Sequence, residues 1–96
     1  MEFVVIAYDG KDEGALDRRL AVREEHLKGA AKMFEDGKLI FASALLNENG
    51  DMNGSIIFCD FPSEEAVNEE WLKKEPYVTG KVWEKVILKR AKVARH

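Results

Sequence analysis

The segment "EFVVIAY" (residues 2–8) constrains the fold most, because it predicts a strand that is apolar on both of its faces. Successive side chains of a strand point to opposite sides of the sheet. One side therefore carries Phe3, Val5 and Ala7, and the other carries Val4, Ile6 and Tyr8. The segment "SIIFCDF" (55–61) repeats this two-sided pattern. Both faces of the sheet that these strands form therefore need to be covered.

The order of the predicted elements decides how the two faces are covered. A long helix is predicted from about residue 13 to 36, and a second helix from Ser63 to about Lys74. The predicted strands are 2–8, 38–46, 55–61 and 81–90. This β-α-β-β-α-β order predicts an α+β fold, the ferredoxin-like sandwich. Its helices cover one face of the sheet, so we expect a homodimer in which two open sheet faces pack together.

Local signals set the expected limits of these elements. Apolar residues three and four positions apart predict one amphipathic helix that packs through them: Leu16, Leu20, Leu27, Ala30, Ala31 and Phe34. Gly37 is expected to form a left-handed cap after it, and "NENGDMNG" (47–54) predicts a hairpin turn. Ser63 can cap the second helix, and Pro76 is expected to end it.

The composition is that of one ordinary globular domain, 1–96, with 46% hydrophobic and 34% charged residues. The net charge is -3 and acids and bases are mixed, so we expect no nucleic-acid partner. We interpret the basic end, "KRAKVARH", as a solvated tail. Apolar runs are too short for a membrane span and no signal peptide is recognisable, which predicts a cytoplasmic location without membrane contact.

Several kinds of chemistry lack the residues that they need. Cys59, in an apolar run, is interpreted as a buried core thiol rather than a nucleophile. One internal histidine and one cysteine do not make a metal site. The glycines are scattered in turns and form no phosphate-binding pattern. We therefore expect no metal and no cofactor, and any catalysis would be acid–base chemistry.

His26, the only internal histidine, is the first candidate for such chemistry. On the long helix it lies at the edge of the apolar stripe, three positions after Arg23 and seven after Arg19, so the three project on one side. One interpretation is a boundary histidine that only packs its ring. The other is a general base that titrates near neutral pH beside an arginine that holds an anionic or enolate-like substrate.

A catalytic histidine needs a carboxylate to orient its ring, and three acids are candidates. Asp9 closes the first strand, and Glu75 lies where the second helix breaks. Asp36 is ten residues beyond His26, about 15 Å along the helix, and is too far to touch it. Asp9 and Asp36 are also explained as turn residues, and Glu75 as a solvated helix-end charge. Tyr77 is either a core aromatic residue or the wall of a pocket.

Two motifs resemble the YciI-like (YCII-related) family, and the resemblance covers almost the whole chain. The first is Arg-x-x-His-Leu, here Arg23 to Leu27, with Gly37 eleven residues after the histidine. The second is acid-Pro-Tyr-Val ahead of the last strand, here Glu75 to Val78. The resemblance implies a dimeric α+β barrel of ferredoxin-like subunits. It also implies a catalytic histidine–acid pair, and one relative is a dehydrochlorinase of chlorinated hydroxyquinones.

By this resemblance His26 matches the family's histidine, and Glu75 stands where an aspartate is usual. The second strand also departs from the family pattern, because "ASALL" replaces a frequent Gly-Pro at the edge of the pocket. Our candidate catalytic residues are His26, Glu75 and Asp9. The candidate substrate-binding residues are Arg23, Tyr77 and Ser43.

Two functions remain open at the level of the sequence. The first is a small cofactor-independent enzyme, an isomerase, lyase or dehydrochlorinase that acts on a small cyclic or aromatic compound. The second is a non-catalytic dimeric module that binds a small ligand or supports a larger enzyme, since fold alone does not decide function. The position of the acid relative to His26 discriminates between them.

Overall fold

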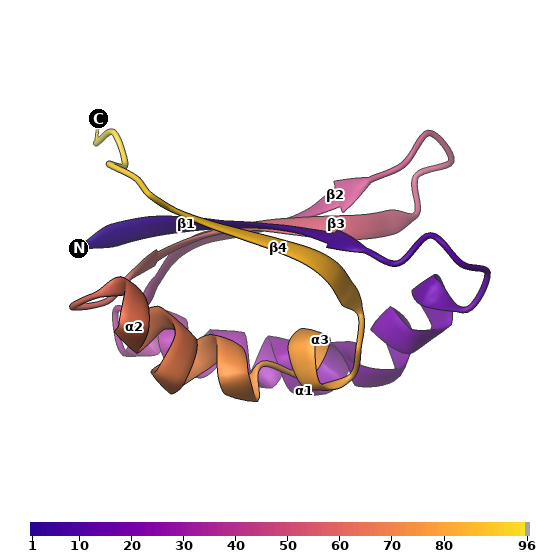
Figure 1. Cartoon of the computed structure of the whole chain (residues 1–96), viewed down its shortest axis with the longest axis horizontal. Helices are drawn as coiled ribbons and strands as arrows, with labels where there is room; N and C mark the ends of the chain where they lie inside the picture. Colours follow the sequence, from indigo (N-terminus) through magenta and orange to yellow (C-terminus); the bar gives the residue numbers. More distant parts are fainter. Residues whose placement is uncertain (96) are drawn as a thin grey trace.

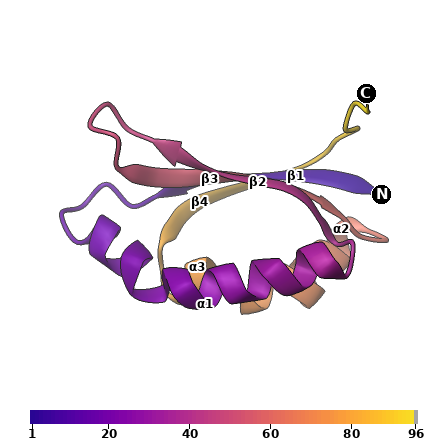
Figure 2. The same cartoon turned by 180° about the vertical axis from the view of Figure 1, so that it is seen from behind.

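The computed structural model describes residues 1–95 and shows one antiparallel sheet with all helices on one of its faces (Figures 1 and 2). The strand order is β2-β3-β1-β4. The main elements are β1 (Glu2–Asp9), α1 (Ala15–Glu35), β2 (Leu39–Leu46), β3 (Met52–Asp60) and β4 (Trp83–Arg90). A segmented helical stretch, 64–79, lies between β3 and β4. The predicted ferredoxin-like α+β fold is confirmed.

The core lies between the sheet and the helices. On this face, Val5 of β1 pairs with Ile57 of β3 and with Leu88 of β4. The buried side chains beneath them include Phe3, Phe61, Val67, Trp71, Tyr77 and Val82. Each large apolar side chain buried in this way stabilises the fold by about 1.5–3 kcal/mol. Cys59 is buried among them, as predicted, and burial raises the pKa of its thiol to about 11.

Helix α1 does not pack through the stripe that its sequence predicts. Leu20, Leu27 and Phe34 are 52%, 46% and 43% exposed, although Ala30 is buried as expected. The buried positions are Ala15, Arg19, His26 and Ala30. Two alanines let the helix approach the sheet closely, and the two polar residues are buried because carboxylates pair with them. The apolar-stripe prediction was therefore wrong for most of its residues.

The second helix is less regular than predicted. It begins at α2 (Glu64–Ala66), where Ser63 Oγ accepts a hydrogen bond from the Ala66 amide, so the predicted cap is confirmed. It continues as a π-helical turn, η1 (Val67–Trp71), and a 3₁₀ turn, η2 (Leu72–Lys74). The proline then starts a further short helix, α3 (Pro76–Thr79), which the sequence reading did not include. Proline suits a first helical position because its missing N–H is not needed there.

Turn residues shift some boundaries. Gly37 has φ 75°, which confirms the left-handed cap after α1. The hairpin between β2 and β3 contains Gly50 at φ 85°, and β3 begins at Met52, three residues before the predicted start. Before β4, Lys81 also has a positive φ of 56°, so the chain turns there and the strand begins at Trp83 rather than at 81.

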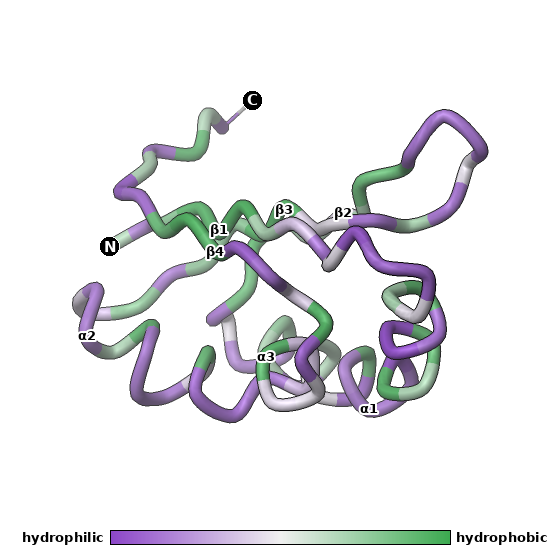
Figure 3. Tube along the Cα trace, turned by 45° about the vertical axis from the view of Figure 1, so that its right-hand side comes forward, coloured by the Kyte–Doolittle hydropathy of each residue, from purple (hydrophilic) through white to green (hydrophobic). Residues whose placement is uncertain are grey.

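The other face of the sheet is open and largely apolar. In the hydropathy view the strands are coloured hydrophobic near the β1 and β4 labels, and the helices alternate between hydrophilic and hydrophobic residues (Figure 3). By strand register its apolar residues are Val4, Ile6, Tyr8, Phe41, Ile56, Phe58 and Ile87, and Lys85 and Lys89 of β4 lie on the same face. Phe41 is 60% exposed. In the folded chain the strands therefore carry apolar residues on both faces of the sheet, as the sequence predicts.

The two ends of the described chain meet beside β1. Glu2 accepts hydrogen bonds from the Val93 amide and from the Arg95 guanidinium, and these contacts lower the pKa of its carboxyl. Of the basic end, Lys89 and Arg90 belong to β4, and Val93 and Arg95 are bound to Glu2 of β1. The last residue, His96, lies outside the described residues. Within residues 1–95, no helix combines the length and hydrophobicity needed to span a membrane.

Candidate functional site

His26 and Glu75 are in direct contact, although 49 positions separate them in the sequence. His26 comes from the middle of α1, and Glu75 is the residue that caps α3. The distance from His26 Nδ1 to Glu75 Oε2 is 2.8 Å, and both side chains are buried. The structure thus brings together the histidine and one of the three acids that the sequence nominates.

Glu75 is held in place by further donors. The indole N–H of Trp71 donates to Oε1 at 3.2 Å, and the backbone amide of Tyr77 donates to Oε2 at 2.9 Å. The π-helical turn ends at Trp71, which places that indole over the carboxylate. Such turns occur frequently at functional sites. With these donors in place, the carboxylate has little freedom to turn away from the histidine.

This arrangement selects one tautomer of the His26 ring. A carboxylate only accepts hydrogen bonds, so it holds a proton on Nδ1 and leaves the lone pair of the neutral ring on Nε2. Within residues 1–95, Nε2 has no hydrogen-bond partner, and the only enclosed side-chain N or O atom without a partner is Nε of Arg19. Nε2 is therefore not sealed off, and His26 lines a cavity.

Tyr77 packs against the histidine as part of both the core and the pocket wall. Its ring stacks on His26 with centroids 3.9 Å apart and an interplanar angle of 16°. The Arg19 guanidinium lies 4.5 Å from the ring centroid on the same tyrosine. Burial raises the pKa of the Tyr77 hydroxyl, which therefore stays protonated at neutral pH.

Asp9 pairs with Arg19 rather than with His26. Both carboxylate oxygens accept from Nη1 of Arg19, at 2.9 and 3.0 Å, and both side chains are buried. Burial raises the pKa of the Asp9 carboxyl, and the Arg19 hydrogen bonds work in the opposite direction. A buried ion pair is costly to assemble, and such groups gather at functional sites more often than elsewhere.

Four residues of the site are absent from the candidate set, namely Arg19, Ser55, Trp71 and Trp83. Arg19 lies seven positions before His26 on the same side of α1, which is a signal that the sequence carries. Its Nη2 donates to Ser55 Oγ at 3.0 Å, and the Trp83 indole donates to the same oxygen at 3.3 Å. Ser55 and the two tryptophans carry no local signal, because only the folded sheet brings them to α1.

A cavity of about 130 Å³ opens between α1 and the β2–β3 edge of the sheet, next to His26. Its charged and polar lining residues are Arg19, Arg23, His26, Ser43, Ser55 and Tyr77. Its apolar lining residues are Leu27, Ala42, Ala44, Met52 and Ile57. No acid lines it. Among residues 1–95 the arginines that form ion pairs are Arg18, Arg19 and Arg95, so the exposed Arg23 brings an uncompensated positive charge.

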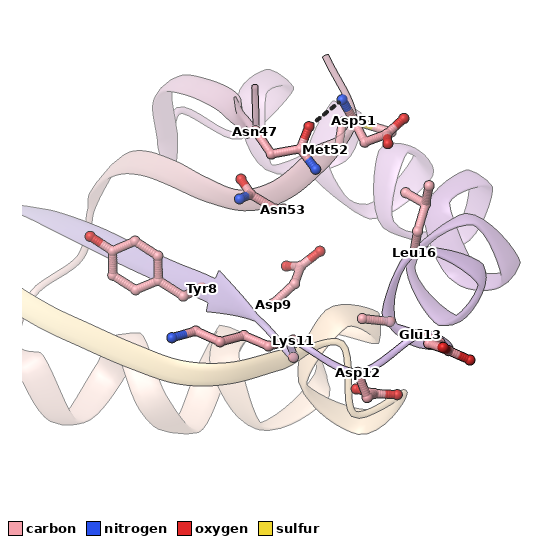
Figure 4. Close-up of a pocket in the computed structure, with 12 residues that line it drawn as sticks. Tyr8, Asp9, Lys11, Asp12, Glu13, Leu16, Asn47, Asp51, Met52 and Asn53 are labelled. Atoms are coloured by element: carbon pink, nitrogen blue, oxygen red, sulfur yellow. Dashed lines mark hydrogen bonds between the residues drawn. The ribbon is translucent and has the colours of Figure 1, made fainter. Parts of the chain in front are cut away.

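A second, larger cavity of about 280 Å³ lies beyond the end of β1 (Figure 4). Its acidic lining residues are Asp9, Asp12, Glu13 and Asp51. Asp12 is bound to Arg18 through two hydrogen bonds of 2.8 Å, and this lowers its pKa to about 2. His26 does not line this cavity, although Met52 lines both cavities.

The remaining candidates have simpler surroundings. Ser43 lines the His26 cavity, but its hydroxyl donates to the backbone carbonyl of Ile56 at 3.3 Å. Asp36 lies at the end of α1, where it pairs with Lys32 at 3.9 Å, away from His26 as expected. No cluster of potential metal ligands occurs in the part of the chain that the structure describes.

Comparison with known proteins identifies the family. The model of the YCII-related domain matches residues 1–92. The chain belongs to the YCII-related family. The protein YciI of Escherichia coli is 33% identical over 95 residues, covering 93% of this chain and 94% of its own. An uncharacterised YCII-related relative from Haemophilus influenzae is 32% identical over the same length.

Two solved structures share the fold of this YCII-related chain. One is the 5-chloro-2-hydroxyhydroquinone dehydrochlorinase of Burkholderia phenoliruptrix, in complex with 2,5-dihydroxybenzoquinone. It has a TM-score of 0.82 at 20% identity and covers 98% of this chain and 96% of its own. The other, protein Atu4242 of Agrobacterium tumefaciens, has a TM-score of 0.52 at 19% identity, with 99% and 95% coverage. At such identities the likeness shows the fold alone.

Proposed function

We propose that this chain is a small cofactor-independent enzyme in which His26 is the general acid–base and Glu75 orients it. The single observation that carries the proposal is the 2.8 Å contact between His26 Nδ1 and Glu75 Oε2, next to a cavity. A histidine that only packs in the core has no need of a carboxylate that two further N–H groups hold. By the family resemblance an aspartate is usual at this position, and here the longer glutamate side chain contacts the ring.

In the proposed reaction, Nε2 of His26 removes a proton from the substrate, and the ring becomes an imidazolium that Glu75 stabilises. The electron pair left on the substrate forms an enolate or phenolate, whose charge Arg23 stabilises. In an isomerisation the proton returns at another carbon. In a dehydrochlorination the electron pair forms a double bond as chloride leaves, so the net loss is HCl. A positioned base of this kind typically contributes about 10²–10⁴-fold in rate.

The cavity supports a substrate the size of one ring. An engineered apolar cavity of about 150 Å³ binds benzene, and the cavity beside His26 measures about 130 Å³. One of its walls is apolar, and its charged lining residues are arginines. A small cyclic or aromatic compound with an acidic or anionic oxygen fits these features. The dehydrochlorinase with the same fold acts on such a compound.

We also propose that the chain functions as a homodimer through its open sheet face. That face is apolar across neighbouring strands, and the side chains of Tyr8 and Phe41 remain exposed on it. Apolar surface gains about 25 cal/mol per Å² when it is buried. Two open faces packed together form the barrel typical of this family. We expect this assembly in the cytoplasm, with no membrane or nucleic-acid partner.

The second candidate function is a binding module without catalysis. The exposed, unpaired Arg23 favours it, because a positive charge at the mouth of a cavity retains small anions without any proton transfer. In that case the histidine would only shape the cavity.

A direct assay separates the two functions. Chloride release from chlorinated hydroquinones and deuterium exchange into cyclic ketones and phenols report on proton abstraction. The proposal predicts activity that falls by about 10²-fold or more in His26→Ala and falls strongly in Glu75→Gln. Glu70→Gln is the matched control, because Glu70 is exposed and pairs only with Lys38 at 3.5 Å. Turnover that is indifferent to His26, or binding without turnover, would favour the module.

A further inference from the structure

Ser55 is a buried hydroxyl group beside the proposed base that the reaction scheme leaves unused. It lies within β3 on the helix-covered face, where it pairs with Ala7 of β1 and Ala44 of β2. The residue is 2% exposed and lines the same cavity as His26. A polar side chain in this position needs hydrogen-bond partners, and its partners decide what it can offer a ligand.

The hydrogen bonds of Ser55 use up its acceptor capacity. A serine hydroxyl has two lone pairs and one proton. Nη2 of Arg19 donates to its oxygen at 3.0 Å, and Nε1 of Trp83 donates to it at 3.3 Å. No acceptor for the hydroxyl proton is found among residues 1–95. The hydroxyl proton of Ser55 is therefore left as an unused hydrogen-bond donor, and Ser55 lines the cavity.

The residues around Ser55 keep its oxygen as an acceptor for them and leave its proton unused. Arginine and tryptophan side chains only donate, so neither of them can receive the serine proton. Arg19 is fixed by the hydrogen bond from its Nη1 to Asp9 Oδ1 at 2.9 Å, and its guanidinium lies over the Tyr77 ring. The Trp83 ring packs edge-on against the same tyrosine, with ring centroids 5.6 Å apart. Donors on an oxygen polarise its O–H bond and strengthen the bond that this group donates.

We propose that the Ser55 hydroxyl donates a hydrogen bond to an oxygen atom of the ligand in the His26 cavity. The ligand oxygen must be an acceptor, such as a phenolate, an enolate or a carbonyl, and not an ammonium or amine group. The absence of acids from the lining and the positive charge of Arg23 favour the same class. Arg19, Trp83 and Asp9 are then positioning residues, which explains why an ion pair is buried there.

The inference rests on the proposed function only for the identity of the site. Ser55 keeps its proton throughout, so no covalent step is involved. If His26 removes a proton next to a carbonyl, the oxygen that gains charge receives a hydrogen bond from a group that is already oriented. Fixed donors of this kind stabilise developing charge without reorganisation.

The test is a binding titration with 4-nitrophenolate, a single-ring anion whose absorbance reports on the polarity around its oxygen. Wild type is compared with Ser55→Ala and with Ser63→Ala, a matched serine-to-alanine control outside the cavity. A hydrogen bond to a charged group predicts affinity lower by about 10- to 100-fold in Ser55→Ala, with a shifted absorbance maximum. Ser63→Ala should bind as wild type does, because Ser63 caps α2 and does not line the cavity.

Ser55→Cys provides a second variant if the alanine protein does not fold, since a thiol fills the same space as a much weaker donor. It should bind the phenolate more weakly than wild type. Equal affinity of wild type and the folded Ser55 variants would overturn the inference, and so would a wild-type protein that does not bind the anion. A purely structural serine would lower thermal stability and leave the affinity unchanged.

This outcome is separable from that of the proposed function. Weak binding by Ser55→Ala together with turnover that is indifferent to His26→Ala would retain Ser55 as a ligand-binding residue and refute the catalytic role. Turnover that depends on His26, with phenolate affinity indifferent to Ser55, would retain the catalytic role of His26 and refute the ligand contact of Ser55.

Discussion

Breaking the buried ion pair between Asp9 and Arg19 should destabilise the fold more than breaking the exposed pair between Asp12 and Arg18. The carboxylate accepts from Nη1 at 2.9 and 3.0 Å, and the side chains of Asp9 and Arg19 are 2% and 3% exposed. Asp9→Asn removes the negative charge and leaves the arginine charged and buried. Breaking a buried pair in this way costs about 3–5 kcal/mol. That is a large share of the roughly 5–15 kcal/mol that stabilises a typical domain.

Urea denaturation of the two proteins, with the same slope in both, measures this loss directly. Asp12→Asn is the control, because Asp12 pairs with Arg18 at 2.8 Å in the same region but on the surface. An exposed pair adds little to stability, so this variant should unfold near the wild-type midpoint. If Asp9→Asn and Asp12→Asn unfolded at the same urea concentration, the buried pair would not have the role that the geometry gives it.

Three further predictions concern other parts of the chain. Trp71→Phe keeps an aromatic side chain but removes the indole N–H that donates to Glu75 at 3.2 Å. We expect a several-fold lower kcat with little change in KM, and an unchanged kcat would contradict the positioning role of Trp71. Phe41→Glu places a charge on the open sheet face, where Phe41 is 60% exposed; light scattering should give the mass of one chain for this variant and of two for wild type, and a wild-type monomer would refute the dimer. Burial raises the pKa of Cys59 from 9.0 to about 11, so the unfolded state loses this proton first and the free energy of unfolding should fall as the pH rises across this interval; Cys59→Ala should abolish the thiol's contribution to that slope, and an identical slope in both proteins would contradict it.

Much of the fold could be predicted because the strands carry strong local signals. β-branched and aromatic runs define the strands, and Gly37 and Ser63 mark the ends of the helices. The packing of α1 could not be predicted in the same way. Leu20, Leu27 and Phe34 remain partly exposed. The buried positions include Arg19 and His26, whose burial depends on acids from distant segments.

The residues of the candidate site could be predicted from the sequence more readily than the pairs that they form. Sequence spacing indicates that Arg19, Arg23 and His26 share one side of a helix, but it does not say which acid reaches which base. That assignment depends on the irregular turns after Val67, which set the position of Glu75 relative to α1. The role of Ser55 depends on two donors from α1 and β4, which no local pattern contains.

The tautomer of His26 tests the central claim most directly, because the whole mechanism requires a lone pair on Nε2. Nitrogen-15 NMR of the imidazole rings distinguishes the two neutral tautomers, and a His96→Gln variant assigns the signals of His26. The account predicts that the neutral form of the ring carries its proton on Nδ1, and that this preference is lost in Glu75→Ala. A proton on Nε2 in the wild-type protein would contradict the 2.8 Å contact with Glu75 as the source of an oriented base.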